Sequence, residues 1–129
     1  MEKHPQIAVV IGAGGGIGSA AAQALAARYR QVIAVSRQPS AVPALAGCDN
    51  VQWLPCAAEE AAITEAAAVI AGASAGLPLA RVVIATGNLH GEGYRPEKSL
   101  RELAAGTLGH LYQVNAVLPL LWLAALEPA

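Results

Sequence analysis

Residues 7–18 read IAVVIGAGGGIG, and this stretch decides how the rest of the chain is interpreted. Residues 7–11 form a short, continuous apolar run rich in β-branched side chains, which is typical of a parallel strand buried on both faces. From residue 16 to about residue 28 the chain is rich in alanine, which predicts a helix. The glycines therefore lie in a loop that joins a buried strand to a helix.

Such a loop suits phosphate groups for two physical reasons. Residues without a Cβ let the backbone approach a pyrophosphate, and the helix N-terminus presents free N–H groups with a partial positive charge. Glycines also occur in ordinary turns, but this placement between strand and helix favours nucleotide binding over a structural turn. The candidate binding residues in the loop are Gly12, Gly14, Gly15, Gly16, Ile17 and Gly18.

Strands and helices are expected to alternate along the remaining chain. Apolar runs at residues 32–35, 51–54 and 82–86 predict three further strands, and residues 58–71 predict a second alanine-rich helix. This alternation predicts right-handed crossovers and a parallel sheet. The expected fold class is α/β, a Rossmann-type three-layer domain with strand order 3-2-1-4.

The last part of the chain, residues 99–126, is helical in composition. We expect two helical pieces, broken near Gly106, with Thr107 as the N-cap of the second piece. The whole chain, residues 1–129, is then one partial domain that stops after the fourth strand and its following helix. A complete doubly wound sheet normally continues beyond its fourth strand.

Length and composition bound the possible functions. The 129 residues suffice for one core, and 55% of them are hydrophobic, so there is ample apolar material to fill it. A net charge of −1 gives no basis for binding nucleic acid or an anionic membrane. The longest apolar run, residues 116–126, is too short to span a bilayer, and the N-terminus lacks a signal-peptide pattern. Cys48 and Cys56 form no paired motif and no metal-ligand spacing with a histidine, so we expect a reduced, cytoplasmic protein.

Several motifs together resemble one protein family. The pattern Gly12-x-x-x-Gly16-x-Gly18 matches the glycine loop of the short-chain dehydrogenases/reductases, although Ile11 stands where that family usually has threonine. Ala85-Thr86-Gly87 falls where the family has Asn-Asn-Ala-Gly, of which only the last glycine is kept, and Val114-Asn115-Ala116 matches its helix-borne Val-Asn-x. The chain thus resembles the nucleotide-binding, amino-terminal half of that family.

This resemblance implies hydride transfer between a carbonyl and an alcohol, carried out by serine, tyrosine and lysine together with the helix asparagine. Asn115 is the one candidate catalytic residue, and its alternative role is to accommodate a helix bend. The only Tyr-x-x-x-Lys match in the sequence runs from Tyr94 to Lys98. We interpret it as a chance match, because Pro96 disfavours the helix that would place the tyrosine and the lysine on one face. The chain alone is therefore expected to have no turnover. His110 is interpreted as a surface or groove residue rather than a ligand.

The end of the second strand decides which cofactor is expected. NAD-binding domains have an acidic residue there for the ribose 2′-OH, whereas NADP-binding domains have a nearby arginine for the 2′-phosphate. Here the strand runs into Ser36 and Arg37 with no acidic residue nearby, so NADP is favoured over NAD. The other interpretation of Arg37 is that it is an ordinary solvated arginine in a loop. The resemblance adds Thr86 and Gly87, after the fourth strand, to the cofactor-binding set.

Two functions stay open at this point. The chain is either part of an NADP-dependent oxidoreductase or a non-catalytic nucleotide-binding or dimerisation module, and an empty scaffold is a weaker third possibility. The fourth strand would be an apolar sheet edge, which is a template for another chain. Leucines cover most faces of the final helix, which then requires burial on all sides. We therefore expect a homodimer through that helix and, as an additional contact, the fourth-strand edge; the helix residues are Leu108, Leu111, Leu118, Leu120, Leu121, Trp122, Leu123 and Leu126.

Overall fold

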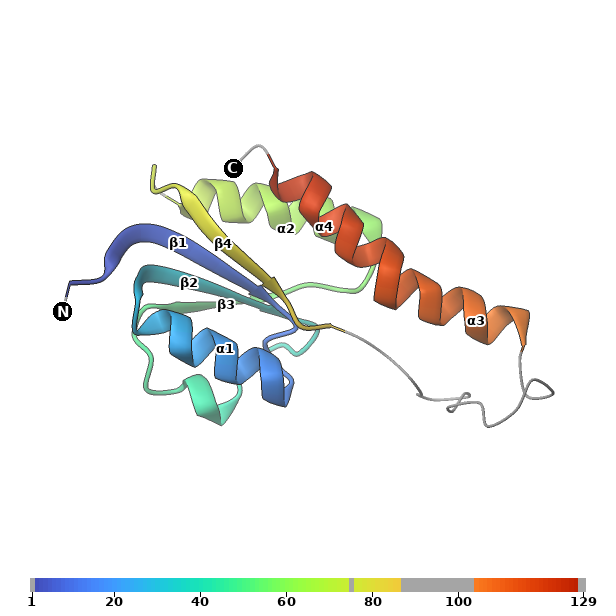
Figure 1. The fold of residues 1–129 in the computed structure, drawn as a ribbon, viewed down its shortest axis with the longest axis horizontal. Coiled ribbons are helices and arrows are strands. Elements are labelled where there is room, and N and C mark those ends of the chain that lie inside the picture. The colour runs from blue at the N-terminus through green and yellow to red at the C-terminus, as the bar shows by residue number, and fades with distance from the viewer. Residues whose placement is uncertain (1, 75, 87–103, 128–129) are drawn as a thin grey trace.

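The computed structural model describes residues 2–74, 76–86 and 104–127 of the chain. Its centre is a sheet of four parallel strands in the order β3-β2-β1-β4 (Figure 1). The strands are β1 (His4–Ile11), β2 (Tyr29–Ser36), β3 (Val51–Pro55) and β4 (Leu79–Ile84). The predicted strand order and the predicted Rossmann-type α/β fold are therefore confirmed.

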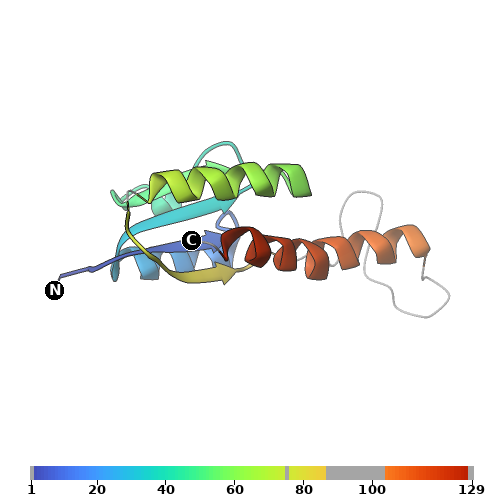
Figure 2. The same cartoon turned by 90° about the horizontal axis from the view of Figure 1, so that it is seen from above.

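Helices cover both faces of the sheet. Helix α1 lies on one face, while α2 and α4 lie side by side on the other, as Figures 1 and 2 show. A short 3₁₀ turn, η1, falls in the loop after β2. The helical elements are α1 (Gly16–Ala26), η1 (Pro43–Leu45), α2 (Glu60–Ala73), α3 (Ala105–Tyr112), the π-helical segment η3 (Gln113–Val117) and α4 (Leu118–Leu126).

Alternate side chains of the strands build two separate cores, one on each face. On the α1 side, Ala8, Val10 and Ala22 are buried in a cluster of mainly small residues, which lets the helix approach the sheet closely. On the other side, larger apolar residues of β1 and β2 pack against two helices, which contribute Ile70 (α2) and Trp122 (α4) to the core. The central strand β1 is fully buried from residue 7 onward, as its continuous apolar run predicts.

The described part of the final helix begins close to the predicted break. Residues 105–126 form one continuous helix of 22 residues, and residues 99–103, where the first helical piece was expected, lie outside the described residues. Its N-cap is Ala104, so Thr107 lies in the first turn, and the prediction that Thr107 is an N-cap is wrong. A glycine within a helix costs only about 1 kcal/mol, so Gly106 does not by itself end one. An irregularity within the helix lies further along, at η3, where one turn is widened.

The side-chain amide of Asn50 joins three segments: the loop before β3, the end of α1 and the start of β2. Asn50 Nδ2 donates hydrogen bonds to the carbonyl oxygens of Ala26 at 2.8 Å and Tyr29 at 2.9 Å.

We expect Asn50→Ala to lower the free energy of unfolding by about 1–3 kcal/mol, because two carbonyls lose their donor. Urea denaturation measures this change. Gln31→Ala, which removes the exposed Gln31–Gln52 hydrogen bond of 3.0 Å, should change the free energy by about 0.5 kcal/mol or less. Equal effects would contradict the role given to Asn50.

Candidate functional site

The glycine loop begins with a residue whose backbone only glycine adopts easily. Gly12 has φ of +90°, and its N–H donates to the Val35 carbonyl at 2.9 Å. A Cβ at Gly12 would stand 2.8 Å from the Ala85 carbonyl, so the loop is pressed against the segment after β4. The Ala85 N–H donates in turn to the Ile11 carbonyl at 2.7 Å. Backbone contacts therefore join β1 to the loop after β4, although Ile11 lacks the hydroxyl of the threonine that the short-chain dehydrogenases/reductases usually have at this position.

Gly18 is required by the packing of the loop on its own helix. A Cβ at this position would overlap the Gly12 carbonyl oxygen and lie 2.7 Å from the carbonyl carbon. Both atoms belong to backbone, which cannot move aside as a flexible side chain would. Gly14 is restricted less severely: its Cβ would lie 2.7 Å from Ser36 Oγ. These contacts set the distance between the first turn of α1 and the loop.

Gly16 has no such structural reason to be glycine. Within the described residues, a Cβ at Gly16 would meet nothing within 4 Å, and one at Gly15 would meet only the Gly12 carbonyl oxygen at 3.8 Å. Gly15 is the N-cap of α1, with no side-chain cap and no acidic residue in the first turn. The first N–H groups of a helix have no acceptor within it. The space beside the backbone of Gly15 and Gly16 is therefore open, and the first N–H groups of α1 have no side-chain cap, which suits an anion.

A cavity of about 760 Å³ lies at the carboxyl ends of the strands. This is the edge at which open α/β sheets bind ligands, and the volume is typical of small-molecule sites. Neither Asp nor Glu is among its described lining residues, so it favours an anionic ligand. The lining consists of Ile11, Gly12, Gly14, Gly15, Val35, Ser36, Arg37, Gln38, Pro39, Cys56, Ala57, Ala58, Ala85, Thr86, His110, Gln113, Val114, Leu118 and Trp122.

Most of the residues predicted for cofactor binding meet at this cavity. Those that line it are Gly12, Gly14, Gly15, Ser36, Arg37 and Thr86. Gly16, Ile17 and Gly18 form the first turn of α1 and do not line it; the Ile17 side chain is 80% exposed. His110 lines the cavity, in agreement with its interpretation as a groove residue.

The predicted catalytic residue lies elsewhere. Asn115 is in η3, the widened turn of the final helix, where it is exposed and does not line the cavity. This position agrees with the alternative role of accommodating a helix irregularity. Gly87 and the segment from Tyr94 to Lys98 lie outside the described residues, so their roles stay predictions.

One wall of the cavity was not predicted. Gln38 and Pro39 after β2, and Cys56, Ala57 and Ala58 after β3, all line it. The third-strand end could have been found from the sequence, because parallel strands bring their carboxyl ends to one edge of the sheet. The two alanines leave room for a flat group there.

Cys56 keeps this wall uncharged. Its Sγ donates to the Ala57 carbonyl at 3.3 Å. Burial raises the pKa of the Cys56 thiol, and the charges of Glu59 and Glu65 raise it further. The thiol is therefore neutral at physiological pH. Among the described residues, no group of three His, Cys, Asp or Glu side chains could hold a metal ion.

No family model and no curated protein matches this chain. Solved structures match it well. A short-chain dehydrogenase from Burkholderia cenocepacia in complex with NADP superimposes with a TM-score of 0.80 at 23% identity, covering 97% of this chain and 51% of its own. A metagenomic short-chain oxidoreductase in complex with NADP gives 0.73 at 25% identity, covering 98% and 57%. A carbonyl reductase from Pseudomonas aeruginosa gives 0.75 at 25% identity, covering 95% and 56%.

The fold and the glycine loop define an α/β protein of the Rossmann type. More particularly, the chain has the fold of the amino-terminal half of the short-chain dehydrogenases/reductases, so the predicted resemblance is confirmed. It spans about half the length of the solved structures that it matches.

The final helix has a second property that bears on partners. The helix over residues 105–126 is long and apolar enough, by length and composition, to cross a membrane. Of its most apolar 18-residue stretch, 11% is buried. The expectation that no apolar stretch is long enough rested on a shorter run, and the continuous helix corrects it. Length and composition are weak indicators for a single helix, because helices that pack in soluble proteins pass the same test.

Proposed function

We propose that this chain binds a dinucleotide, NADP(H) in preference to NAD(H), as part of an oxidoreductase similar to the short-chain dehydrogenases/reductases. The observation that supports this most directly is the open space at Gly15 and Gly16, in front of the uncapped N-terminus of α1. A pyrophosphate in that space would accept hydrogen bonds from backbone N–H groups without a side chain in its way. The adjacent cavity has room for the rest of the cofactor.

The preference for NADP(H) rests on the end of β2. Arg37 is exposed at the rim of the cavity, next to Ser36, and the described lining has no carboxylate to accept a ribose 2′-OH. A guanidinium pairs well with a phosphate, because it presents several N–H donors in one plane. Two of the structures with the same fold are complexes with NADP. On the opposite side of the cavity, Thr86 would contact the cofactor from the β4 loop.

The cofactor, when bound, would supply or accept a hydride at its nicotinamide ring. The residues of this chain would bind and orient it: the glycine loop at the pyrophosphate, Ser36 and Arg37 at the adenosine ribose, and Thr86 with Gly87 toward the nicotinamide side. Asn115 is retained as the one candidate catalytic residue.

The alternative is a nucleotide-binding module without catalysis. One observation favours it: neither tyrosine nor lysine is among the described residues that line the cavity. Both alternatives share the nucleotide site, so binding measurements test what they have in common. Because the 129-residue chain alone is expected to have no turnover under either alternative, the coding sequence after codon 129 separates them: a continuation that contains Tyr-x-x-x-Lys would support the oxidoreductase.

The cofactor preference gives a direct test. Arg37→Ala should weaken NADPH binding about 10- to 100-fold, because it removes charge-assisted hydrogen bonds to the 2′-phosphate, and should leave NADH binding within about twofold. Arg37→Lys is the matched control. It keeps the charge but not the planar arrangement of donors, so its affinity for NADPH should fall between the other two. Isothermal titration calorimetry measures the NADPH and NADH affinities of the three proteins. An unchanged ratio of NADPH to NADH affinity in Arg37→Ala would contradict the role of this arginine.

We also propose that the chain forms a homodimer through its final helix. Leu118, Trp122 and Leu126 are buried against the α2 side of the core. Other large apolar residues of this helix are exposed: Leu108, Tyr112, Leu120 and Leu123. The edge of β4 offers an additional contact, because β4 pairs only with β1 in the described sheet.

A further inference from the structure

The segment that carries Arg37 is tied to the sheet on both sides of that residue. Before it, the Ser36 carbonyl accepts a hydrogen bond from the Cys56 N–H at 2.8 Å. After it, the Gln38 N–H donates to Ser36 Oγ at 3.1 Å, and the Gln38 carbonyl accepts a hydrogen bond from Trp53 Nε1 at 2.9 Å. The backbone on either side of Arg37 is thus held by hydrogen bonds, and the arginine side chain extends from a fixed point.

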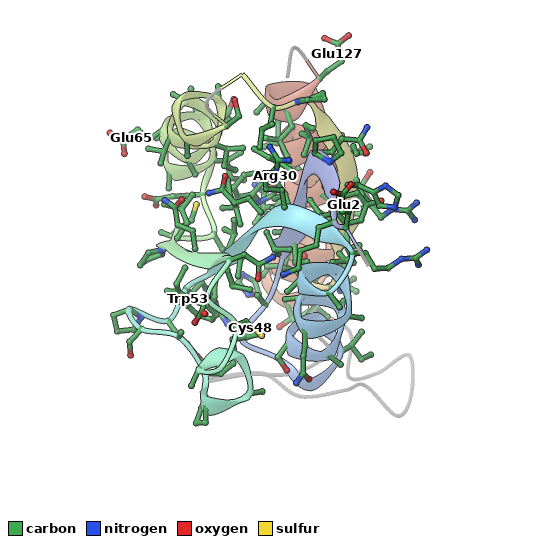
Figure 3. The ribbon with its side chains drawn as sticks, turned by 90° about the vertical axis from the view of Figure 1, so that its left-hand side faces the viewer. Glu2, Arg30, Cys48, Trp53, Glu65 and Glu127 are labelled. Atoms are coloured by element: carbon green, nitrogen blue, oxygen red, sulfur yellow. The ribbon has the colours of Figure 1, made fainter. Side chains whose placement is uncertain are left out.

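Trp53 makes its contact from outside the cavity. It belongs to β3 and packs with the core on the α1 side of the sheet, together with Val42, Leu45 and Cys48 of the loop after β2. Figure 3 shows Trp53 and Cys48 on the same side of the molecule as α1. Trp53 is not among the residues that line the cavity, whereas Gln38 is. The indole therefore holds the loop without access to a ligand.

The indole N–H is well suited to this task. It is the only polar group of the side chain and can only donate, and here its partner is the Gln38 carbonyl. The ring itself is anchored by the core cluster, so the donor has a fixed position. A flexible donor such as lysine would have to be ordered first, at a cost in side-chain entropy.

We propose that Trp53 is a positioning residue that sets cofactor preference by holding the Arg37 loop in its binding conformation. This inference rests on the proposed binding of NADP(H). A loop that is ordered before binding loses less entropy when its arginine engages a 2′-phosphate. NADH has a hydroxyl group at that position and gains nothing from Arg37, so the hydrogen bond from Trp53 should discriminate between the two cofactors.

The test is Trp53→Phe, which keeps an aromatic ring in the core and removes the donor. We expect NADPH affinity to fall about three- to tenfold, as for one lost hydrogen bond, with NADH affinity unchanged. In an Arg37→Ala background the same substitution should have no further effect on NADPH. Gln31→Ala is the matched control, since it removes another exposed side-chain hydrogen bond, the one between Gln31 of β2 and Gln52 of β3, toward the other end of β2. It should change neither affinity.

Two readouts separate failure of this inference from failure of the proposed function. Equal losses for NADPH and NADH, or losses from Trp53→Phe and Arg37→Ala that simply multiply, would overturn the positioning role while leaving nucleotide binding intact. A wild-type chain that binds neither nucleotide would overturn the proposed function and, with it, any role of Trp53 in cofactor preference. Amide hydrogen exchange at Arg37 and Gln38 in the free protein should be faster in Trp53→Phe. Unchanged exchange would show that the indole does not hold the loop, and would overturn the inference by itself.

Discussion

Gly18→Ala is expected to destabilise the domain by about 3 kcal/mol or more, enough to unfold a large fraction of a marginally stable protein. The added Cβ would overlap the Gly12 carbonyl oxygen, and the Ala13 Cα stands 3.0 Å away on the same side. Relief would require a shift of the loop, which is held by the hydrogen bonds of Gly12 and Ala13 to the Val35 carbonyl. The gain in helix propensity from glycine to alanine, about 1 kcal/mol, is smaller. Urea denaturation followed by circular dichroism measures the loss.

Gly16→Ala is the matched control, two residues earlier in the same turn. Its Cβ enters open space in the described structure, so the free energy of unfolding should stay the same or rise by up to about 1 kcal/mol. Nucleotide affinity should nevertheless fall about tenfold or more, because the methyl group would stand where a pyrophosphate approaches the backbone. A stable Gly18→Ala variant would contradict the packing argument. A Gly16→Ala variant that binds nucleotide as tightly as the wild type would place the phosphates elsewhere.

The part of the fold that could be predicted depends on local signals that agree with one another. The apolar run at residues 7–11, the glycines after it and the alanine-rich helix all indicate the same strand–loop–helix unit. Once this unit is accepted, crossover handedness leaves few orders for four parallel strands. The glycine loop, Ser36, Arg37 and Thr86 then meet because parallel strands end at one edge.

The errors come from features that depend on tertiary packing. Gly106 and Thr107 indicate a helix boundary, and the described helix does begin nearby, at Ala105, but its N-cap is Ala104 and not Thr107. The π-helical turn at Gln113–Val117 has one local signal, Pro119, which lies just after it and has no N–H to donate within the helix. It matters for the site, because Asn115 lies in that turn and not on the cavity wall. The hydrogen bond from Trp53 to Gln38 likewise joins residues 15 apart in the chain, and only the register of β2 with β3 brings them together.

The exposed apolar residues of the final helix form one stripe along it. Leu108 and Tyr112 are four residues apart, and Leu120 and Leu123 are three apart, so each pair shares a face. Tyr112 and Leu120 are eight residues apart, which makes two turns when one of them is widened to a π turn. The stripe faces away from Leu118 and Trp122, which are buried. In Figures 1 and 2 the α3 end of this helix extends beyond the carboxyl ends of the strands, away from the sheet on which α4 packs.

Leu120→Glu is therefore expected to convert a homodimer into a monomer. Leu120 is 65% exposed in the single chain, and in a two-fold interface each substitution counts twice. Loss of two buried leucines and burial of two carboxylates should weaken association about a hundredfold or more. Light scattering at micromolar concentration measures the mass of both proteins. Val69→Glu is the matched control, because Val69 is 46% exposed but belongs to α2; this variant should remain dimeric. A monomeric wild type would contradict the proposal, and a wild type that partitions into lipid vesicles would identify a membrane, not a second copy of the chain, as the partner of this stripe.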